Sequence, residues 1–122
     1  MITSIKSVAE FHQLLQNNKG LFIIKFGATW CGPCKLIDQD VHKFFTEAPS
    51  NVQCAVIDID ECPVIYGFLK TKKMVNGVPA LLCYYKGNVN YVPDDFVIGA
   101  NKSELYKFFE RCRQQVSSTI GA

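Results

Sequence analysis

The sequence has little net charge and no long apolar run, and each absence excludes a class of protein. Its 122 residues carry 13 Lys and Arg against 11 Asp and Glu, a formal net charge of +2 at pH 7. That excess is too small to indicate a nucleic-acid or membrane-surface partner. No stretch approaches the roughly 20 apolar residues of a membrane span. Because Lys6, Glu10 and His12 precede the first apolar run, we also expect no secretory signal.

Histidine is scarce as well, with two in the chain. His12 and His42 are far apart and fall in predicted helices. Zinc would need two further ligands beside Cys31 and Cys34, and the sequence does not place them there. We therefore expect no metal and no other cofactor. The 48% of hydrophobic residues is enough for the core of one domain.

Cysteine, in contrast, is frequent, with six in this short chain. Cys54 and Cys83 lie inside apolar, strand-like runs, whereas disulfide scaffolds are rich in loops. Buried packing is also the expected role of Cys62 and Cys112. The pattern favours one redox pair and four ordinary thiols in a reducing compartment, which predicts a cytoplasmic protein.

Hydrophobic periodicity predicts strands that alternate with helices. The expected strands cover residues 2–5, 21–27, 52–59, 80–85 and 96–98. The expected helices begin after Ser7, at Pro33, at Cys62 and after Asn101, and the last ends near Gln115. Short connections and right-handed crossovers then predict an α/β fold, with a central sheet and helices on both faces. We expect one domain over residues 1–115 and a short frayed tail over 116–122.

The most informative stretch is Trp-Cys-Gly-Pro-Cys-Lys at residues 30–35, directly after the apolar run 21–26. Pro33 suits the first turn of a helix, where its missing N–H has no intrahelical partner to lose. Cys31 then lies at the helix N-terminus, where free N–H groups and the helix dipole favour a negative sulfur. A thiolate is the nucleophile of disulfide exchange. Cys34 is near enough to close a small disulfide ring with it.

This motif and three later ones resemble the thioredoxin family. The later ones are Val-Pro-Ala at residues 78–80, Gly87 in the following turn, and Gly-Ala at residues 99–100. Together they cover residues 5–112. The resemblance implies a thioredoxin fold, with a central mixed five-stranded sheet flanked by four helices. It also implies a thiol–disulfide oxidoreductase that reduces protein disulfides.

The resemblance also implies roles for the residues of the motif. Cys31 would be the attacking thiolate, and Cys34 the buried thiol that resolves the mixed disulfide. Trp30 would pack beside the disulfide and shape the docking surface. Gly32 and Pro33 would tune the helix entry and the redox potential.

Three residues outside the motif would complete a substrate groove. Pro79 would follow a cis bond and face the disulfide, and the Val78 backbone would meet an extended substrate. Gly99 would form the other lip. The implied partners are disulfide-containing proteins and a thioredoxin reductase, in electron transport and cell redox homeostasis, with the chain as a monomer. The alternative is a binding or assembly subunit of the same fold whose redox activity is secondary.

Lys25 departs from the family pattern, because members usually have a buried acid at this position of the strand before the motif. Three interpretations stay open. Lys25 relays the proton in a neutral form, or it stays charged and stabilises the Cys34 thiolate. Alternatively, its stem lies in the core and its amine reaches an acid such as Asp58, or water. A second departure is extra length around residues 61–78 and 88–98, which either narrows the partner range or is a neutral surface insertion.

Overall fold

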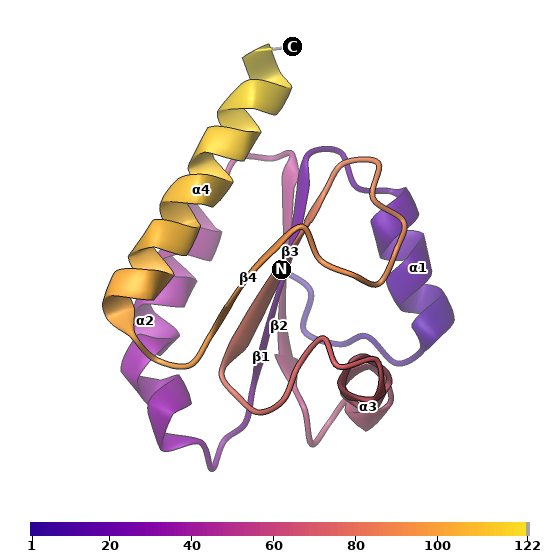
Figure 1. Ribbon diagram of the computed structural model, residues 1–122, viewed down its shortest axis with the longest axis vertical. Helices are drawn as coiled ribbons and strands as arrows, with labels where there is room; N and C mark the ends of the chain where they lie inside the picture. Colours follow the sequence, from indigo (N-terminus) through magenta and orange to yellow (C-terminus); the bar gives the residue numbers. More distant parts are fainter. Residues whose placement is uncertain (122) are drawn as a thin grey trace.

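The computed structural model describes the backbone of residues 1–121 and the side chains of residues 1–118. Helices and strands alternate through most of the chain (Figure 1). In chain order the elements are α1 (Val8–Gln16), β1 (Leu21–Gly27), α2 (Gly32–Glu47), β2 (Val52–Asp58), α3 (Pro63–Thr71), β3 (Ala80–Tyr85), β4 (Asp95–Ile98) and α4 (Lys102–Gly121).

The sheet is mixed and follows the order β2-β1-β3-β4. The central strand β1 pairs in parallel with β2 and antiparallel with β3, which pairs antiparallel with β4. Helices α2 and α4 cover one face, and α1 and α3 cover the other (Figure 1). The predicted α/β architecture with a covered mixed sheet is therefore confirmed.

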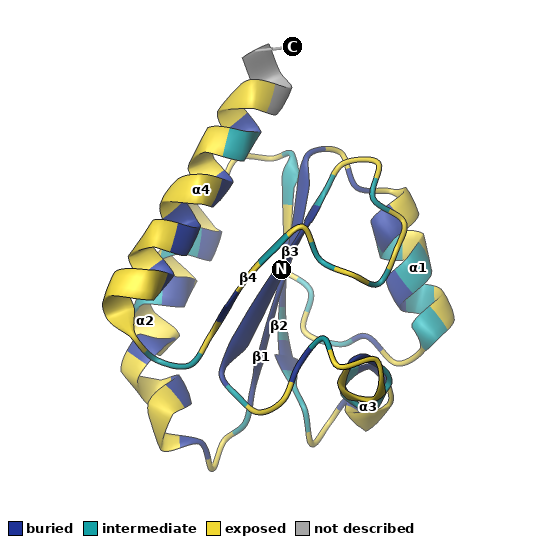
Figure 2. Ribbon diagram, viewed as in Figure 1, coloured by how far each residue is buried: buried dark blue, intermediate teal, exposed yellow. Residues whose placement is uncertain are grey.

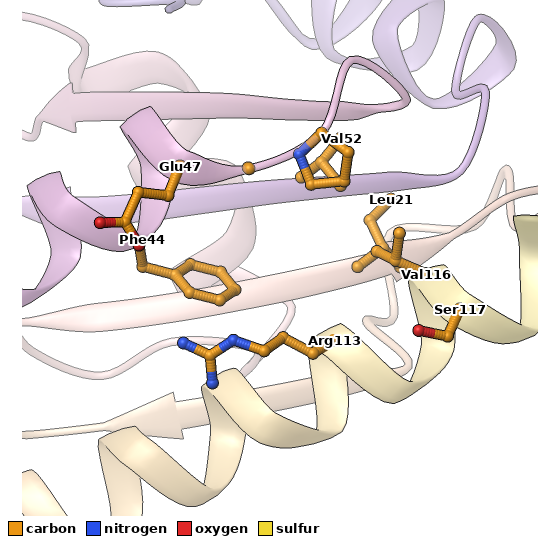
Figure 3. Close-up of a pocket in the computed structure, with 9 residues that line it drawn as sticks. Leu21, Phe44, Glu47, Val52, Arg113, Val116 and Ser117 are labelled. Carbon is orange, nitrogen blue, oxygen red and sulfur yellow. The ribbon is translucent and has the colours of Figure 1, made fainter.

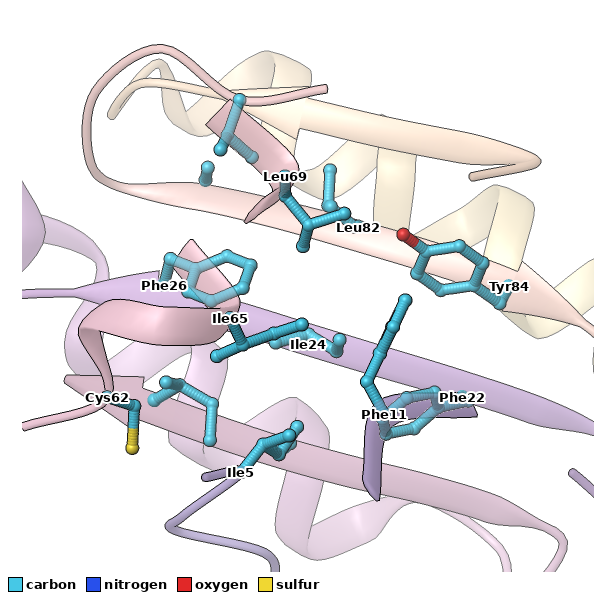
Figure 4. Packing of buried hydrophobic residues seen from close by; sticks show 14 of the residues in the cluster. Ile5, Phe11, Phe22, Ile24, Phe26, Cys62, Ile65, Leu69, Leu82 and Tyr84 are labelled. Atoms are coloured by element: carbon cyan, nitrogen blue, oxygen red, sulfur yellow. The ribbon is translucent and has the colours of Figure 1, made fainter. Parts of the chain in front are cut away.

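The predicted fifth strand at residues 2–5 is wrong, because the described residues form four strands. Ile2 makes only an isolated parallel bridge with Ala55 at the sheet edge. The chain then leaves that edge, and Ile5 enters the core beneath α1 and α3 (Figure 4). Ile5 lies outside the ladder and is completely buried, and this burial is worth about 2 kcal/mol.

The core has two layers, one on each face of the sheet. Strand β1 is buried along its whole length because helices cover both of its faces (Figure 2). Alternation sends Phe22, Ile24 and Phe26 toward α1 and α3, where they pack in the layer of Figure 4. Leu21 and Ile23 face α2 and α4. By the same alternation, Lys25 belongs to the α2 side of the sheet.

Helices α1 and α4 start directly after Ser7 and Asn101, as predicted, and each of these residues caps its helix. The Ser7 hydroxyl accepts a hydrogen bond from the Glu10 N–H at 3.0 Å, and Asn101 accepts one from the Glu104 N–H at the same distance. The last helix continues past Gln115 to Gly121, because buried Val116 extends its apolar face. The predicted fraying of the tail falls partly on residue 122 and on the side chains of 119–121, which lie outside the described residues.

The long segment between β3 and β4, part of the region of extra length noted at residues 88–98, forms a loop. Its Tyr91 ring packs edge-on against Phe68 of α3, with 5.8 Å between ring centroids. The Tyr84 hydroxyl donates a hydrogen bond to the Tyr91 carbonyl at 2.7 Å. These contacts fasten the loop to the body of the domain. Within the part of the chain that is described, no helix has the length and apolar composition needed to cross a bilayer.

Candidate active site

The two motif cysteines are positioned by the join between β1 and α2. Strand β1 ends at Gly27, and a short turn leads to Cys31, which caps α2 in an extended conformation (φ −86°, ψ 107°). The Cys34 N–H donates a hydrogen bond to the Cys31 Sγ at 3.1 Å. Pro33 lies in the first helical turn, as predicted. The Cys31 sulfur therefore occupies the position that a serine or aspartate oxygen takes at an ordinary helix start.

Cys31 and Cys34 are joined by a disulfide, with 5.3 Å between their Cα atoms. Both residues are buried, with 3% of Cys31 and 2% of Cys34 exposed. Burial was expected for Cys34, whereas Cys31 was expected to be the attacking sulfur. The Cys31 Sγ lies 3.7 Å from the Val78 carbonyl oxygen, so the Val78 backbone is one of the groups that cover it.

The backbone segment Val78–Pro79 forms a wall beside the Cys31 sulfur, which faces the Val78 carbonyl. The Val78–Pro79 peptide bond is cis, as expected. The Gly99 N–H donates to the Pro79 carbonyl at 2.9 Å, which ties the end of β4 to this wall. Gly99 has φ of +89°, a conformation that L side chains rarely adopt. An added Cβ there would meet no atom of the chain within 4 Å, so the backbone, rather than crowding, calls for glycine.

Trp30 is 65% exposed beside the disulfide, and its indole Nε1–H donates to the Asp60 carboxylate at 2.7 Å. Asp60 belongs to the turn after β2, and no pattern in the sequence had marked it as part of the site. Gly32 follows Cys31, and a Cβ built on it would point into open space. Both residues that flank Cys31 in the sequence are therefore open to approach: an exposed aromatic ring and an uncrowded glycine.

Lys25 is 6% exposed, and its amine forms an ion pair with the Asp38 carboxylate, whose side chain is half exposed. Asp58, the acid named as an expected partner of Lys25, is engaged elsewhere, because its Oδ1 accepts a hydrogen bond from the backbone N–H of Asp60 at 2.8 Å. Asp38 was missed, although a signal was available. It follows Cys34 by four residues, so both lie on one face of α2.

Lys25 also lies near Cys34. The position that a Gly27 Cβ would occupy is 3.6 Å from the Lys25 Nζ and 3.7 Å from the Cys34 Sγ. A pocket of about 300 Å³ opens here, lined by residues that include Lys25, Cys34, Asp38 and Asp58. The buried sulfur is therefore next to a small polar pocket.

A second pocket, of about 370 Å³, lies between α2 and α4 near the start of β1 (Figure 3). Leu21, Phe44, Val52 and Val116 line it, together with Arg113. It contains no cysteine, and β1 separates it from the motif by its whole length. It is therefore not part of the thiol chemistry. No three His, Cys, Asp or Glu side chains among the described residues gather as metal ligands.

The four remaining cysteines are free and buried. Burial raises the pKa of the Cys54 thiol to about 12. The pKa of Cys83 is also raised, first by a hydrogen bond with Cys112 and then by burial. Cys62 lies in the layer beneath α1 and α3, 3.8 Å from the Ser4 hydroxyl. Their packing agrees with the expectation that these residues act as small apolar side chains.

Comparison with known proteins identifies the arrangement. The family model for thioredoxin matches residues 2–111. Thioredoxin-2 of Saccharomyces cerevisiae is 33% identical over 105 residues, which cover 86% of this chain and 92% of the yeast protein. Horse thioredoxin (Equus caballus) is 34% identical over 106 residues, with the same two shares.

Solved structures agree with these matches. The oxidised form of mitochondrial thioredoxin 3 from S. cerevisiae superposes with a TM-score of 0.70 at 29% identity, covering 90% of this chain and 94% of that one. Thioredoxin from Trypanosoma brucei brucei gives 0.71 at 25% identity, covering 93% and 92%. With its Cys31–Cys34 disulfide, the chain belongs to the thioredoxin family and is a thiol–disulfide oxidoreductase, a protein-disulfide reductase.

Proposed function

We propose that Cys31 is the attacking thiolate and Cys34 the resolving thiol in the reduction of protein disulfides. One observation carries this assignment: the Cys31 sulfur caps α2 and faces the Val78 carbonyl, whereas the Cys34 sulfur is turned toward Lys25 and Gly27. The helix dipole and the Cys34 N–H favour a negative charge on the capping sulfur. Cys31 is also the sulfur that adjoins the groove.

The exchange then runs in two steps, starting from the reduced protein. The Cys31 thiolate attacks one sulfur of a substrate disulfide, forms a mixed disulfide and expels the other substrate sulfur as a thiolate. Cys34 loses its proton and attacks the Cys31 sulfur, which forms the Cys31–Cys34 bond and releases the second substrate thiolate. Two electrons pass from the protein to the substrate, and both substrate thiolates take protons from water.

The groove residues orient the substrate for the first step. An extended segment would lie along the Val78 backbone, held there by Pro79, with Gly99 as the opposite lip. Trp30, fixed by Asp60, would support the substrate beside the disulfide. Gly32 leaves room for the approach, and Pro33 fixes the helix entry that positions Cys31.

The partners we propose are disulfide-containing proteins and a thioredoxin reductase that returns the electrons, so that the chain serves electron transport and cell redox homeostasis. Four free cysteines favour a reducing compartment, and we propose the cytoplasm. The net charge of +2 favours neither nucleic acid nor a membrane surface as a partner. We propose a monomer that meets each partner in turn.

A reduction assay tests this function. The wild-type chain should reduce insulin with NADPH and a thioredoxin reductase, and Cys31→Ser should abolish turnover. Cys34→Ser should instead trap the mixed disulfide, which mass spectrometry detects as a covalent adduct. A wild-type chain that reduces no protein disulfide under these conditions would contradict the proposal.

A second candidate is a binding or assembly subunit with secondary redox activity, favoured by Lys25 at the usual position of an acid. The two candidates differ in what they require of the thiols. Variants Cys31→Ser and Cys34→Ser that keep the full biological role in cells lacking the wild-type chain would establish the binding role. Loss of that role in both variants would establish the reductase.

A further inference from the structure

The Lys25–Asp38 ion pair links the buried end of the redox site to the surface. Lys25 projects from β1 toward α2. A Cβ built on Gly27 would lie 3.6 Å from the Lys25 amine and 3.7 Å from the Cys34 sulfur, so these two groups border the same small space. Asp38 holds this amine from the next turn of α2, and half of the Asp38 side chain reaches solvent. One end of the ion pair therefore lies near the Cys34 sulfur, and the other end reaches solvent.

The charges around this pocket make Lys25 distinctive. Among the described residues that line it, Lys25 alone is a cation, and Asp38, Asp58 and Glu61 are the acids. Asp58 accepts the N–H groups of Asp60 and Glu61, and the Lys6 amine reaches the Glu61 backbone at 3.5 Å. His42 lines the other side of the ion pair, together with Val41 and Val56.

The ion pair determines what Lys25 can do for Cys34. A buried amine without a partner tends to lose its charge, whereas a paired one keeps it. A protonated amine has no lone pair with which to accept the Cys34 proton. Its positive charge, however, lowers the cost of a buried thiolate. A carboxylate in this place would have accepted the proton but repelled the thiolate that forms.

We propose that Lys25, held by Asp38, favours the Cys34 thiolate through its charge and thereby drives the resolving step without a buried proton acceptor. This inference rests on the proposed reductase function. The Cys34 S–H bond breaks and its proton passes to water of the pocket, while Lys25 keeps its own proton. The thiolate then forms the bond to the Cys31 sulfur and breaks the bond between Cys31 and the substrate. Lys25 and Asp38 are thus positioning residues, because they act through Cys34.

Both partners are needed for this effect. Removing the cation with Lys25→Met keeps an apolar stem of similar size but makes the thiolate more costly. Removing the anion with Asp38→Asn leaves the buried amine without a partner, so that it tends to lose its charge and the thiolate again becomes more costly. A purely structural ion pair would instead lower stability in both variants and leave the ionisation of Cys34 where it was.

The resolving step is observed with DTNB and the reduced full-length chain in single turnovers. Cys31 releases a first TNB thiolate when it attacks, and Cys34 releases a second when it closes the disulfide. The pH profile of the second phase reports the ionisation of Cys34. We expect Lys25→Met to move this profile up by about one pH unit and to slow the phase about tenfold at pH 7. Asp38→Asn should move it in the same direction, and the double variant should behave as Lys25→Met.

Two further variants serve as controls. Lys25→Arg keeps the charge and should retain the wild-type profile, even if it lowers stability. Asp40→Asn removes another α2 carboxylate, which pairs with Lys102 at 3.4 Å on the side toward α4, and should change nothing. Urea unfolding of each variant confirms that it is folded, and Asp38→Asn, which alters a half-exposed side chain, keeps the test open if Lys25→Met does not fold.

Coincident profiles in wild type and Lys25→Met would overturn the inference, as would shifts of Lys25→Met and Asp38→Asn in opposite directions. Either result would leave the reductase function standing, because the wild-type second phase would still be present. A wild-type chain that released only the first TNB thiolate would instead contradict the proposed function itself.

Discussion

The same side chain behaves differently in two parts of this molecule. Cys31 and Cys34 lie at the start of α2, and Cys54, Cys83 and Cys112 lie in the core layer between the sheet and helices α2 and α4. Exposure does not separate the two groups, since Cys31 is 3% exposed and Cys54 is 6% exposed. What differs is the surroundings of the sulfur.

The core thiols are packed among apolar side chains, and Cys83 lies close to Cys112. Burial raises the pKa of Cys54 to about 12, and a hydrogen bond with Cys112, followed by burial, raises that of Cys83. The Cys31 sulfur, in contrast, receives the Cys34 N–H at a helix N-terminus. The comparison teaches that local dipoles and charges, rather than accessible area, select the redox pair in this fold.

The largest expected effect is the loss of activity in Cys31→Ser. A hydroxyl cannot form the mixed disulfide, so we expect insulin reduction to fall by at least about a thousandfold, or about 4 kcal/mol. The free energy of unfolding of the reduced protein should change little, because a serine hydroxyl is a good helix cap. Assays of turnover and of urea unfolding measure both quantities. Residual activity within tenfold of wild type would break the comparison.

The same substitution in the core, Cys83→Ser, places a hydroxyl between the sheet and α4. We expect this variant to unfold about 1 to 3 kcal/mol more easily, because the hydroxyl loses its water. Its reductase activity, measured below the unfolding transition, should stay within twofold of wild type. A stable but inactive Cys83→Ser would show that the core thiols take part in the chemistry.

The raised pKa of Cys54 predicts how stability changes in alkali. The folded protein holds the Cys54 proton up to about pH 12, whereas the unfolded chain releases it near its ordinary value of 9.0. Stability from this group is therefore complete below pH 9 and is lost between pH 9 and 12, by about 1.4 kcal/mol at pH 10. Urea titrations from pH 8 to 10 should show a shallower decline in Cys54→Ala. Identical slopes would mean that Cys54 is not shielded in the fold.

The smallest expected effect concerns the exposed rim of the site. Asp60→Asn weakens the hydrogen bond that fixes the Trp30 indole, without touching either sulfur. We expect kcat/KM for insulin reduction to fall only a few-fold, less than about 1 kcal/mol, with unchanged thermal stability. The reaction with the small reagent DTNB should not change, because it needs no docking surface. Equal losses with both substrates would show that Trp30 also affects the sulfur itself.

The parts of the fold that could be predicted are those fixed by local patterns. The apolar run 21–26, Pro33 and the spacing of Cys31 and Cys34 predict a strand, a helix start and one helical turn between two sulfurs, and none of these needs a distant residue. The prediction of a strand at residues 2–5 is wrong because local sequence allows a strand there, whereas tertiary packing takes Ile5 into the core. Only the assembled sheet edge reveals that choice.

The partner of Lys25 shows the same limit in the site. Asp58 and Asp38 both border the pocket, and sequence distance favours neither. Asp58 is occupied by the turn after β2, which is a property of the folded loop. Asp38 becomes available because α2 packs over the face of β1 that carries Lys25. The sequence indicates which face of β1 carries Lys25 and which face of α2 carries Asp38. Only the packing of the helix on the sheet, however, brings these two faces together.

Alkylation of the reduced protein tests most directly the claim that surroundings, rather than exposure, select the reactive thiol. Brief treatment with iodoacetamide at pH 7, followed by peptide mass spectrometry, gives a rate for each cysteine. The account predicts that Cys31 reacts at least about a hundredfold faster than Cys54, although Cys54 is slightly more exposed. Modification of Cys54 at the rate of Cys31, or ahead of it, would contradict the account.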